Sequence, residues 1–281
     1  FVQGDIRDVD KVKEAVKGCS HVIHLAGIVT DELVDMNPAM GKAVNEGGTQ
    51  NLVEAARLAG VRRFVYASSS SVYGLASRNR DSTEEDEPQP MTVYAVSKLA
   101  GERLVKDLAG GMEWAIARSA SCCGPTPRMR LDTIINVFSK QAWFDGEITV
   151  FDGSQWRSNI HVQDAAGWYA RALTEPSWNY EIFNLTAGND QANGWARMVA
   201  MVANREFRHP TGVRVDESKK DDRHYRLDGS KLRLAGFVPR YSIKDAVRHN
   251  LAWFKGGRLA NPNDDLFYNN RRMAAAMKEI T

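Results

Sequence analysis

The sequence predicts an α/β fold in which a parallel β-sheet is covered by helices on both faces. Short, nearly continuous apolar runs at 22–25, 64–67 and 114–117 alternate with longer helical patterns at 40–58 and 94–108. Strands that are apolar throughout suit a sheet buried on both faces, with helical crossovers between the parallel strands. In such a doubly wound sheet, ligands bind at the carboxyl ends of the strands.

The composition indicates a globular protein whose partners are small molecules. The 281 residues are 43% hydrophobic and 26% charged, and the formal net charge is +2. A protein with this net charge lacks the strongly positive electrostatic potential that is typical of nucleic-acid-binding proteins. No apolar stretch approaches the roughly 18 residues that cross a bilayer, so we expect a cytoplasmic protein without membrane partners. The cysteines have no metal-ligand spacing, and no metal is expected.

Tyr94 and Lys98 lie one turn apart at the start of a helical pattern, and therefore on the same helix face. An ammonium beside a phenol favours the phenolate, a base that can remove a hydroxyl proton while hydride leaves the same carbon. Tyrosine and lysine also occur at this spacing on many solvated helices, so the pair alone does not establish a catalytic site.

A hydroxyl-rich turn, Ser68 to Ser71, follows the apolar run at 64–67. It lies where an open α/β sheet binds its ligand, so one of these serines could orient a substrate hydroxyl toward Tyr94. The ordinary role of serines in a turn is to cap the local backbone, and most of the four are expected to do that.

Several segments, in their order along the chain, resemble the extended short-chain dehydrogenases/reductases, above all UDP-galactose 4-epimerases and related nucleotide-sugar epimerases and dehydratases. The resemblance continues through 118–125, 157–164 and 222–231, and so covers nearly the whole chain. It implies a Rossmann-like fold and NAD as cofactor, with a nucleotide-diphosphate sugar as substrate. The segments that carry it are Gly4-Asp5-Ile6-Arg7-Asp8, His24-Leu25-Ala26-Gly27, Asn45 with Gly48-Thr49, Ser68-Ser69-Ser70-Ser71-Val72-Tyr73-Gly74, and Tyr94-x-x-x-Lys98.

The resemblance also implies roles for single residues. Tyr94 becomes the catalytic base, Lys98 its electrostatic partner and a ribose ligand, and Ser69 the hydroxyl that positions the sugar. The residues implied in cofactor binding are Asp5, Ile6, Leu25, Ala26, Gly27, Asn45, Ala67, Ser68, Tyr94, Lys98 and Ala120. A glycine-rich turn normally holds the pyrophosphate of a dinucleotide at a helix N-terminus. We expect that segment upstream of Phe1, so the fold is expected to be N-terminally truncated in this chain.

On the substrate side, the resemblance places Arg157 and Arg223 on the nucleotide diphosphate, since guanidinium forks match phosphate oxygens. The hydroxyl residues implied in substrate binding are Ser69, Ser70, Ser71 and Ser121. Similar 4,6-dehydratases carry an acidic pair where this chain has Ser70 and Ser71, so elimination of water is disfavoured.

Two regions are expected. Residues 1–124 form a partial dinucleotide-binding domain, to which 155–186 returns. Residues 125–154 and 187–255 form a smaller substrate-binding region, and a peripheral tail follows from 256 to 281. The opening residues should be the end of a strand, followed by a helix that Asp8 caps.

The leading hypothesis is an epimerase that oxidises a sugar hydroxyl to a ketone with NAD and returns hydride to the other face. An NAD(P)-dependent sugar dehydrogenase or reductase, or a 4,6-dehydratase, would use the same Tyr94 and Lys98. A third hypothesis is an inactive binding module that has lost its phosphate loop. The patterns at 40–58 and 94–108 resemble the helix pair at the dimer contact of similar proteins, so a homodimer is expected.

Overall fold

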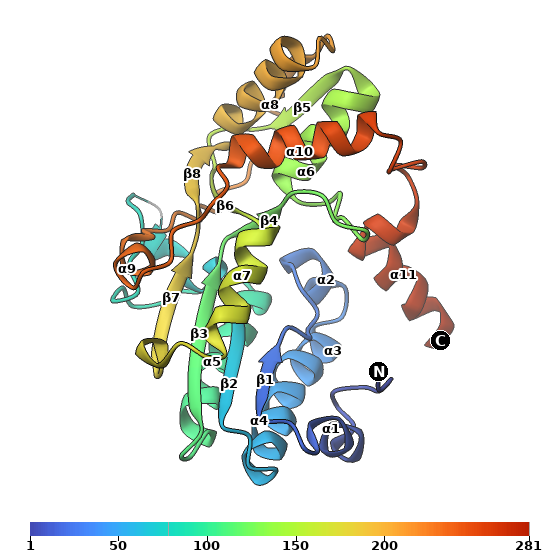
Figure 1. Cartoon of the computed structure of the whole chain (residues 1–281). Coiled ribbons are helices and arrows are strands. Elements are labelled where there is room, and N and C mark those ends of the chain that lie inside the picture. Colours follow the sequence, from blue (N-terminus) through green and yellow to red (C-terminus); the bar gives the residue numbers. More distant parts are fainter. Residues whose placement is uncertain (78, 281) are drawn as a thin grey trace. The chain divides into compact units, whose positions relative to one another are not determined.

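The computed structural model describes residues 1–77 and 79–280, and the chain divides into two compact units (Figure 1). Unit 1 comprises Phe1–Ser119, Ala166–Leu185 and Asp228–Phe237. Unit 2 comprises Ala120–Ala165, Thr186–Leu227 and the chain from Val238 onward.

A four-stranded parallel sheet forms the centre of unit 1 and confirms the predicted fold class (Figure 1). Its three strands in the first half of the chain confirm the predicted apolar runs. Ser69 lies opposite Ser119, so the carboxyl ends of the second and third strands meet at one edge of the sheet. In spatial order, the strands are β1 (His21–His24), β2 (Arg63–Ser69), β3 (Glu113–Ser119) and β7 (Glu181–Leu185).

Helices cover both faces of this sheet. Neighbouring residues of each strand point to opposite sides, so these apolar strands present side chains that need covering on both faces. On one face, Tyr66 and Ile182 pack into a cluster with helices α4 and α5. On the other, Phe183 packs against Trp168 of α7 and Trp178, whose rings stack at 5.6 Å. The helices that contribute residues to unit 1 are α1 (Val9–Val16), α2 (Asp31–Met36), α3 (Pro38–Lys42), α4 (Gly48–Leu58), α5 (Val93–Leu108), α7 (Val162–Ala172) and α9 (Ser230–Leu234).

Two local predictions for unit 1 need correction. The helix predicted over 40–58 is divided by a π-helical turn, η1 (Ala43–Gly47), which turns the Asn45 side chain toward the loop after β1. Residues 1–5 lie outside any strand, and Asp5 instead begins a turn in which its carbonyl accepts from the backbone N–H of Asp8. The predicted cap is confirmed: the Asp8 carboxylate accepts from two backbone N–H groups in the first turn of α1.

Unit 2 has a core of its own, built around α6 (Ile134–Lys140), α8 (Ala192–Glu206) and α10 (Ile243–Lys255). The tail includes one more helix, α11 (Asn269–Ile280). The strands form two small sheets: β4 (Ser121–Cys123), β6 (Trp156–His161) and β8 (Gly188–Gln191) in one, and β5 (Glu147–Phe151) with β9 (Gly212–Asp216) in the other.

Residues 228–237 belong to unit 1 rather than to the predicted substrate-binding region, and the predicted return of the segment 155–186 to unit 1 holds for 166–185. Only its last strand, β7, joins the main sheet, whereas β6 pairs with β4 and β8 in unit 2. Both strands have buried, strand-like patterns, and such a pattern does not specify which sheet a strand joins.

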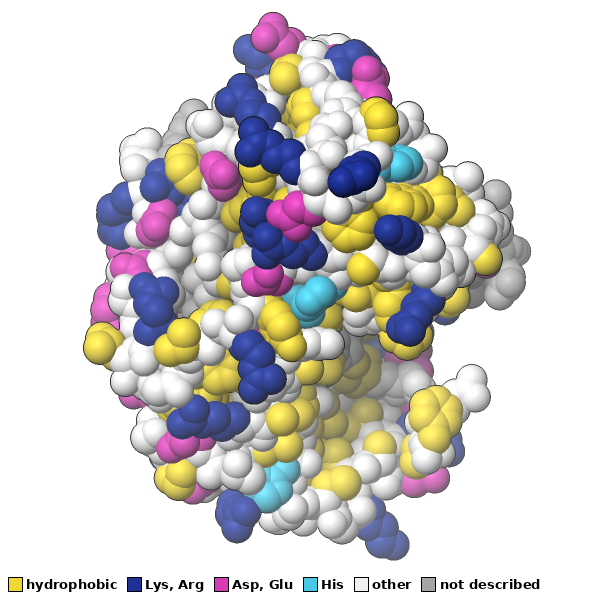
Figure 2. All heavy atoms as spheres, turned by 45° about the horizontal axis from the view of Figure 1, so that its top comes forward, with side chains coloured by type: hydrophobic (Ala, Val, Ile, Leu, Met, Phe, Trp, Pro, Cys, Tyr) yellow, Lys and Arg dark blue, Asp and Glu magenta, His cyan; other side chains and the backbone are white. Residues whose placement is uncertain are grey.

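The surface carries charges of both signs. On the face drawn in Figure 2, Lys and Arg side chains are interspersed with Asp and Glu side chains. Among the described residues, no helix has the length and apolar character needed to cross a bilayer.

Candidate active site

Helix α5 begins where the sequence analysis expected it, and this start places Tyr94 and Lys98 together. Thr92 has an extended backbone, and its hydroxyl accepts from the N–H of Ala95 at 3.2 Å, so the helix begins at Val93. Tyr94 is half-buried in the first turn, and Lys98 is buried one turn later. The two side chains thus project from the same helix face.

The Lys98 ammonium lies at the carboxyl end of β2. Its Nζ donates to the carbonyl oxygen of Ala67 at 2.6 Å and lies 4.9 Å from the centre of the Tyr66 ring. Burial lowers the pKa of Lys98 to about 8, although the negative charge of Glu102 opposes this shift. The side chain therefore remains mostly protonated at neutral pH, and this positive charge lies on the same helix face as Tyr94.

Ser69 ends β2 and opens the short 3₁₀ turn η2 (Ser70–Tyr73). Its hydroxyl oxygen accepts from the backbone N–H of Ser71 at 3.2 Å and from the Ser71 hydroxyl at 2.9 Å. Because both bonds use Ser69 as acceptor, its own proton stays available for another acceptor, such as a substrate hydroxyl. Ser70 and Ser71 are only 7% and 5% exposed, and Ser71 serves to orient Ser69.

Asn45 connects the loop after β1 to α5. Its Oδ1 accepts from the N–H of Ile28 at 2.8 Å, and its Nδ2 donates to the Ile28 carbonyl at 2.9 Å and the Ser97 hydroxyl at 3.1 Å. Ser97 in turn donates to the carbonyl oxygen of Tyr94 at 2.8 Å. The Asn45 amide therefore links the loop after β1 to the first turns of α5.

The loop after β1 fits a dinucleotide. Leu25 is 59% exposed at the carboxyl end of its strand, although it is a large apolar residue. A Cβ at Gly27 would lie 3.0 Å from Asn45 Oδ1 and 3.9 Å from Lys98 Nζ, so the chain needs a glycine to pass this close to both. An open apolar rim beside a buried lysine suits the ribose and ring of NAD.

Near the N-terminus, Asp5 is hydrogen-bonded to Arg7 and Ile6 is packed against Gly48. The Asp5 carboxylate accepts from the backbone and the guanidinium of Arg7, with Nη2 at 2.6 Å, and these hydrogen bonds hold the pKa of Asp5 below its usual range. Ile6 packs against Gly48, where a Cβ would meet the isoleucine side chain. The pairing of Asp5 with Arg7 was not anticipated from the sequence.

A buried ion pair behind the hydroxyl turn was also not anticipated. Glu102 is fully buried on α5 and accepts from Arg118 Nε at 3.1 Å and Nη2 at 2.9 Å. The Ser68 hydroxyl donates to the same carboxylate at 2.5 Å, so this pair anchors the end of β2. Helical spacing indicates only that Glu102 shares a face with Lys98, and it does not link Glu102 to Arg118, which lies 16 positions away.

His24 in β1 is a second buried group near Lys98. It is 2% exposed, and its Nε2 lies 2.9 Å from the Thr49 hydroxyl. The threonine donates its proton to the carbonyl oxygen of Asn45, so the histidine Nε2 must be the donor in the first bond. Burial, with the charge of Lys98, lowers the pKa of His24 to about 3, and the ring stays neutral at ordinary pH.

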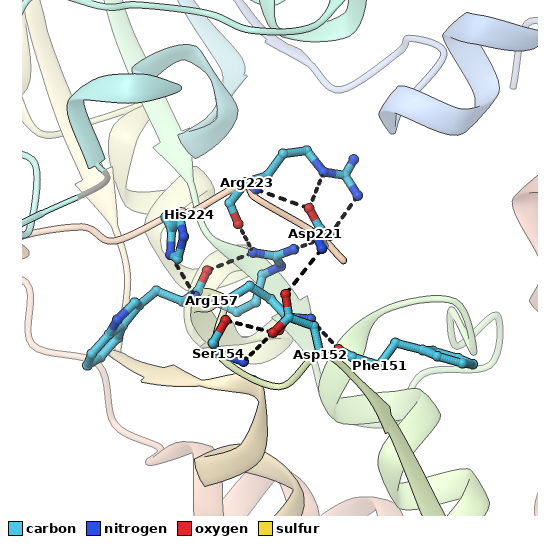
Figure 3. Close-up of polar contacts among 9 residues, drawn as sticks. Phe151, Asp152, Ser154, Arg157, Asp221, Arg223 and His224 are labelled. Carbon is cyan, nitrogen blue, oxygen red and sulfur yellow. Dashed lines mark hydrogen bonds and ion pairs between the residues drawn. The ribbon is translucent and has the colours of Figure 1, made fainter. Parts of the chain in front are cut away.

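The remaining predicted residues lie in unit 2. Ala120 is buried, and Ser121 lies in β4 opposite Asn159. Figure 3 shows Arg157 of β6 and Arg223 pointing toward one carboxylate, that of Asp221. The two arginines named from the sequence are therefore brought together within this unit.

Comparison with known proteins places the chain in a family. The model of the NAD dependent epimerase/dehydratase family matches residues 1–186. A putative UDP-glucose 4-epimerase of Methanocaldococcus jannaschii is 28% identical over 270 residues, which cover 91% of this chain and 84% of the relative. The dTDP-glucose 4,6-dehydratase of Streptomyces griseus is 26% identical over 260 residues, which cover 90% of this chain and 77% of the relative.

The similarity extends to solved structures. The UDP-glucose 4-epimerase of Thermus thermophilus, crystallised in complex with NAD, matches with a TM-score of 0.79 at 24% identity, covering 91% of this chain and 85% of that one. That structure shares the fold. Because the family match spans more than half of the sequence, the chain belongs to the NAD dependent epimerase/dehydratase family and is an NAD-dependent enzyme of that class.

Proposed function

We propose that the protein epimerises a nucleotide-diphosphate sugar through a transient ketone, with Tyr94 as the base. The observation that carries this proposal is the buried Lys98 ammonium one turn from Tyr94, at the strand edge where Ser69 ends β2. In a family whose members include epimerases and dehydratases, this arrangement supports proton removal from a sugar hydroxyl.

Tyr94, Lys98 and Ser69 have separate roles in the proposed reaction. Tyr94, as phenolate, takes the hydroxyl proton, and the neighbouring ammonium of Lys98 favours that phenolate. Ser69 donates a hydrogen bond to the sugar hydroxyl oxygen and so orients it. NAD, when bound, would supply the hydride acceptor, and then the hydride donor, at the same carbon. Tyr94 would give its proton back to the ketone oxygen, and because the hydride would return to the opposite face of the ketone, the carbon configuration would be inverted without net oxidation.

The residues around NAD are proposed from the resemblance to the short-chain dehydrogenases/reductases. Lys98 would contact the ribose, and Asn45 would brace the loop on which the cofactor lies. The loop itself contributes Leu25, Ala26 and Gly27. The remaining proposed contacts are Asp5, Ile6, Ala67, Ser68 and Ala120.

The nucleotide diphosphate is proposed to bind at Arg157 and Arg223, whose guanidinium groups converge in unit 2. Paired forks of this kind match the oxygens of phosphate groups. Ser121 is proposed to contact the sugar. The relatives named above act on nucleotide-linked glucose by their names, which supports the same substrate class here.

Epimerisation is favoured over water elimination by the hydroxyl turn. Ser70 and Ser71 supply no carboxylate to act as acid or base, and Ser71 is hydrogen-bonded to Ser69. Ser71 therefore acts through Ser69, and we propose no separate acid-base pair at Ser70 and Ser71.

The test is to incubate the full-length protein with NAD and UDP-glucose, and then to identify the sugar product by NMR while following the absorbance of reduced nicotinamide. An inverted sugar without accumulation of reduced nicotinamide is expected. Stoichiometric reduced nicotinamide would indicate a dehydrogenase, and a deoxy-keto sugar a dehydratase. NAD binding without turnover of any nucleotide sugar would indicate a binding module.

We also propose a homodimer formed through the face that α4 and α5 share. An open pocket of about 480 Å³ lies on this face, lined by residues of α3, η1, α4 and α5 that include Lys42, Glu46, Arg103 and Asp107. Charges of both signs at one surface can pair with those of a second copy across a two-fold axis. Light scattering should give twice the monomer mass, and a monomer mass at micromolar concentration would contradict the proposal.

A further inference from the structure

Arg157 and Arg223 share one acceptor, the carboxylate of Asp221 (Figure 3). Arg157 Nη2 donates to Asp221 Oδ2 at 2.6 Å. Arg223 donates to both carboxylate oxygens, through Nε to Oδ1 at 2.7 Å and through Nη2 to Oδ2 at 2.8 Å. A single internal anion therefore binds both guanidinium groups.

The turn that carries this carboxylate is itself held in place. The Asp221 backbone N–H donates to Asp152 Oδ2 at 3.3 Å, and Asp152 Oδ1 accepts from the Ser154 hydroxyl at 2.8 Å. Burial alone would raise the pKa of Asp221, but hydrogen bonds from Arg223 and the charges of both arginines hold it below its usual range. Asp221 is thus an ionised and well-placed anion at neutral pH.

Arg157 has further anchors that do not depend on the carboxylate. Its Nη1 donates to the carbonyl oxygens of Trp156, at 2.9 Å, and of Arg223. Its guanidinium carbon also lies 5.3 Å from the centre of the Tyr225 ring. Loss of the Asp221 charge should therefore leave Arg157 pointing the same way.

A carboxylate and a phosphate present similar pairs of oxygens to a guanidinium fork. Two guanidinium groups and one carboxylate leave a single net positive charge, whereas a nucleoside diphosphate brings at least two negative charges. Such a ligand must either displace Asp221 or bind beside a like charge, and both lower its affinity.

We propose that Asp221 is an internal competitor that occupies the arginine fork until a nucleoside diphosphate displaces it. The proposal rests on the proposed function, in which Arg157 and Arg223 hold the diphosphate of the substrate. Asp221 would then determine specificity, because only a ligand with more negative charge than one carboxylate would be favoured to displace it from the two arginines.

The test is calorimetric titration of UDP into the NAD-saturated, full-length protein. Asp221→Asn keeps the size of the side chain and the Oδ1 acceptor but removes the charge. Removal of a like charge several ångströms from a phosphate should tighten UDP binding by about tenfold. Asp222→Asn is the matched control: it removes an exposed carboxylate from the next position in the segment and should change the affinity by less than about twofold.

Arg157→Ala and Arg223→Ala separate this inference from the function on which it rests. If both leave UDP binding unchanged, the diphosphate is bound elsewhere and that part of the proposed function fails. If they weaken UDP binding while Asp221→Asn weakens it or leaves it unchanged, Asp221 only supports the arginines and the inference fails. Equal tightening by Asp222→Asn would likewise overturn it, since the effect would then be one of overall charge. Unfolding midpoints equal to that of the wild type confirm that each variant is folded.

Discussion

Replacing Glu102 with Gln should destabilise the protein severely, although the side chain hardly changes in size. Glu102 and Arg118 have side-chain exposures of 0% and 4%. Burial lowers the pKa of Arg118, but the hydrogen bonds and charge of Glu102 outweigh this and raise it. Glu102→Gln therefore leaves a guanidinium that is still charged, buried and without its counter-charge.

Removal of one partner from a buried ion pair costs about 3–5 kcal/mol, of a total folding free energy of about 5–15 kcal/mol. That range includes the free-energy cost of removing the Glu102 carboxylate as the charged acceptor of the Ser68 hydroxyl. Urea unfolding followed by tryptophan fluorescence measures it, because Trp114, Trp168 and Trp178 report on unit 1 while the other four tryptophans report on unit 2. Unit 1 should therefore unfold at a much lower urea concentration in the variant.

The matched control replaces both charged residues, Glu102→Met with Arg118→Met. Substitution of both members of a buried pair by apolar residues of similar volume is often nearly neutral, so the double variant should recover most of the loss. A loss below about 1 kcal/mol for Glu102→Gln, the value of an exposed pair, would refute the reasoning. So would a double variant as unstable as the single one.

Three further outcomes are expected. Gly101→Ala would drive a methyl group into the Tyr66 hydroxyl and should lower the free energy of unfolding in urea by about 3 kcal/mol. Gly167→Ala, whose Cβ meets nothing within 4 Å, should raise it by about 0.5–1 kcal/mol, and equal unfolding midpoints for the two variants would contradict this. Asn45→Ala removes three hydrogen bonds worth about 1 kcal/mol each and should also raise the KM for NAD in steady-state assays; an unchanged KM would argue against the bracing role. Because the working form of Lys98 is the ammonium and its pKa is about 8, kcat/KM should fall as pH rises through that value; a rate that rises steadily to pH 10 would contradict the assignment.

The features that the sequence could predict depend on local signals. Thr92 is a favourable cap two residues before Tyr94, and Asp8 is a favourable cap before α1, so both helix starts follow from residue type alone. The apolar runs that became β1, β2 and β3 have the continuous pattern of strands buried on both faces. With the helix start fixed, the shared face of Tyr94 and Lys98 follows from the helical repeat.

The features that could not be predicted depend on contacts between distant segments. Arg157 and Asp221 are 64 positions apart, and no periodic pattern links them. The π-helical turn at Ala43–Gly47 lies within a good helical pattern, and its Asn45 bonds to a loop 17 residues away. Likewise β6 has the pattern of a buried strand, but its partners decide that it joins unit 2.

The central claim is that the Tyr94 hydroxyl transfers the proton of the sugar. The most direct measurement is the epimerisation rate of Tyr94→Phe, a change that removes one oxygen and retains the ring. The account predicts that kcat falls at least about a hundredfold, while the affinity for NAD and the unfolding midpoint stay those of the wild type. A variant that interconverts the two sugars at nearly the wild-type rate would contradict it.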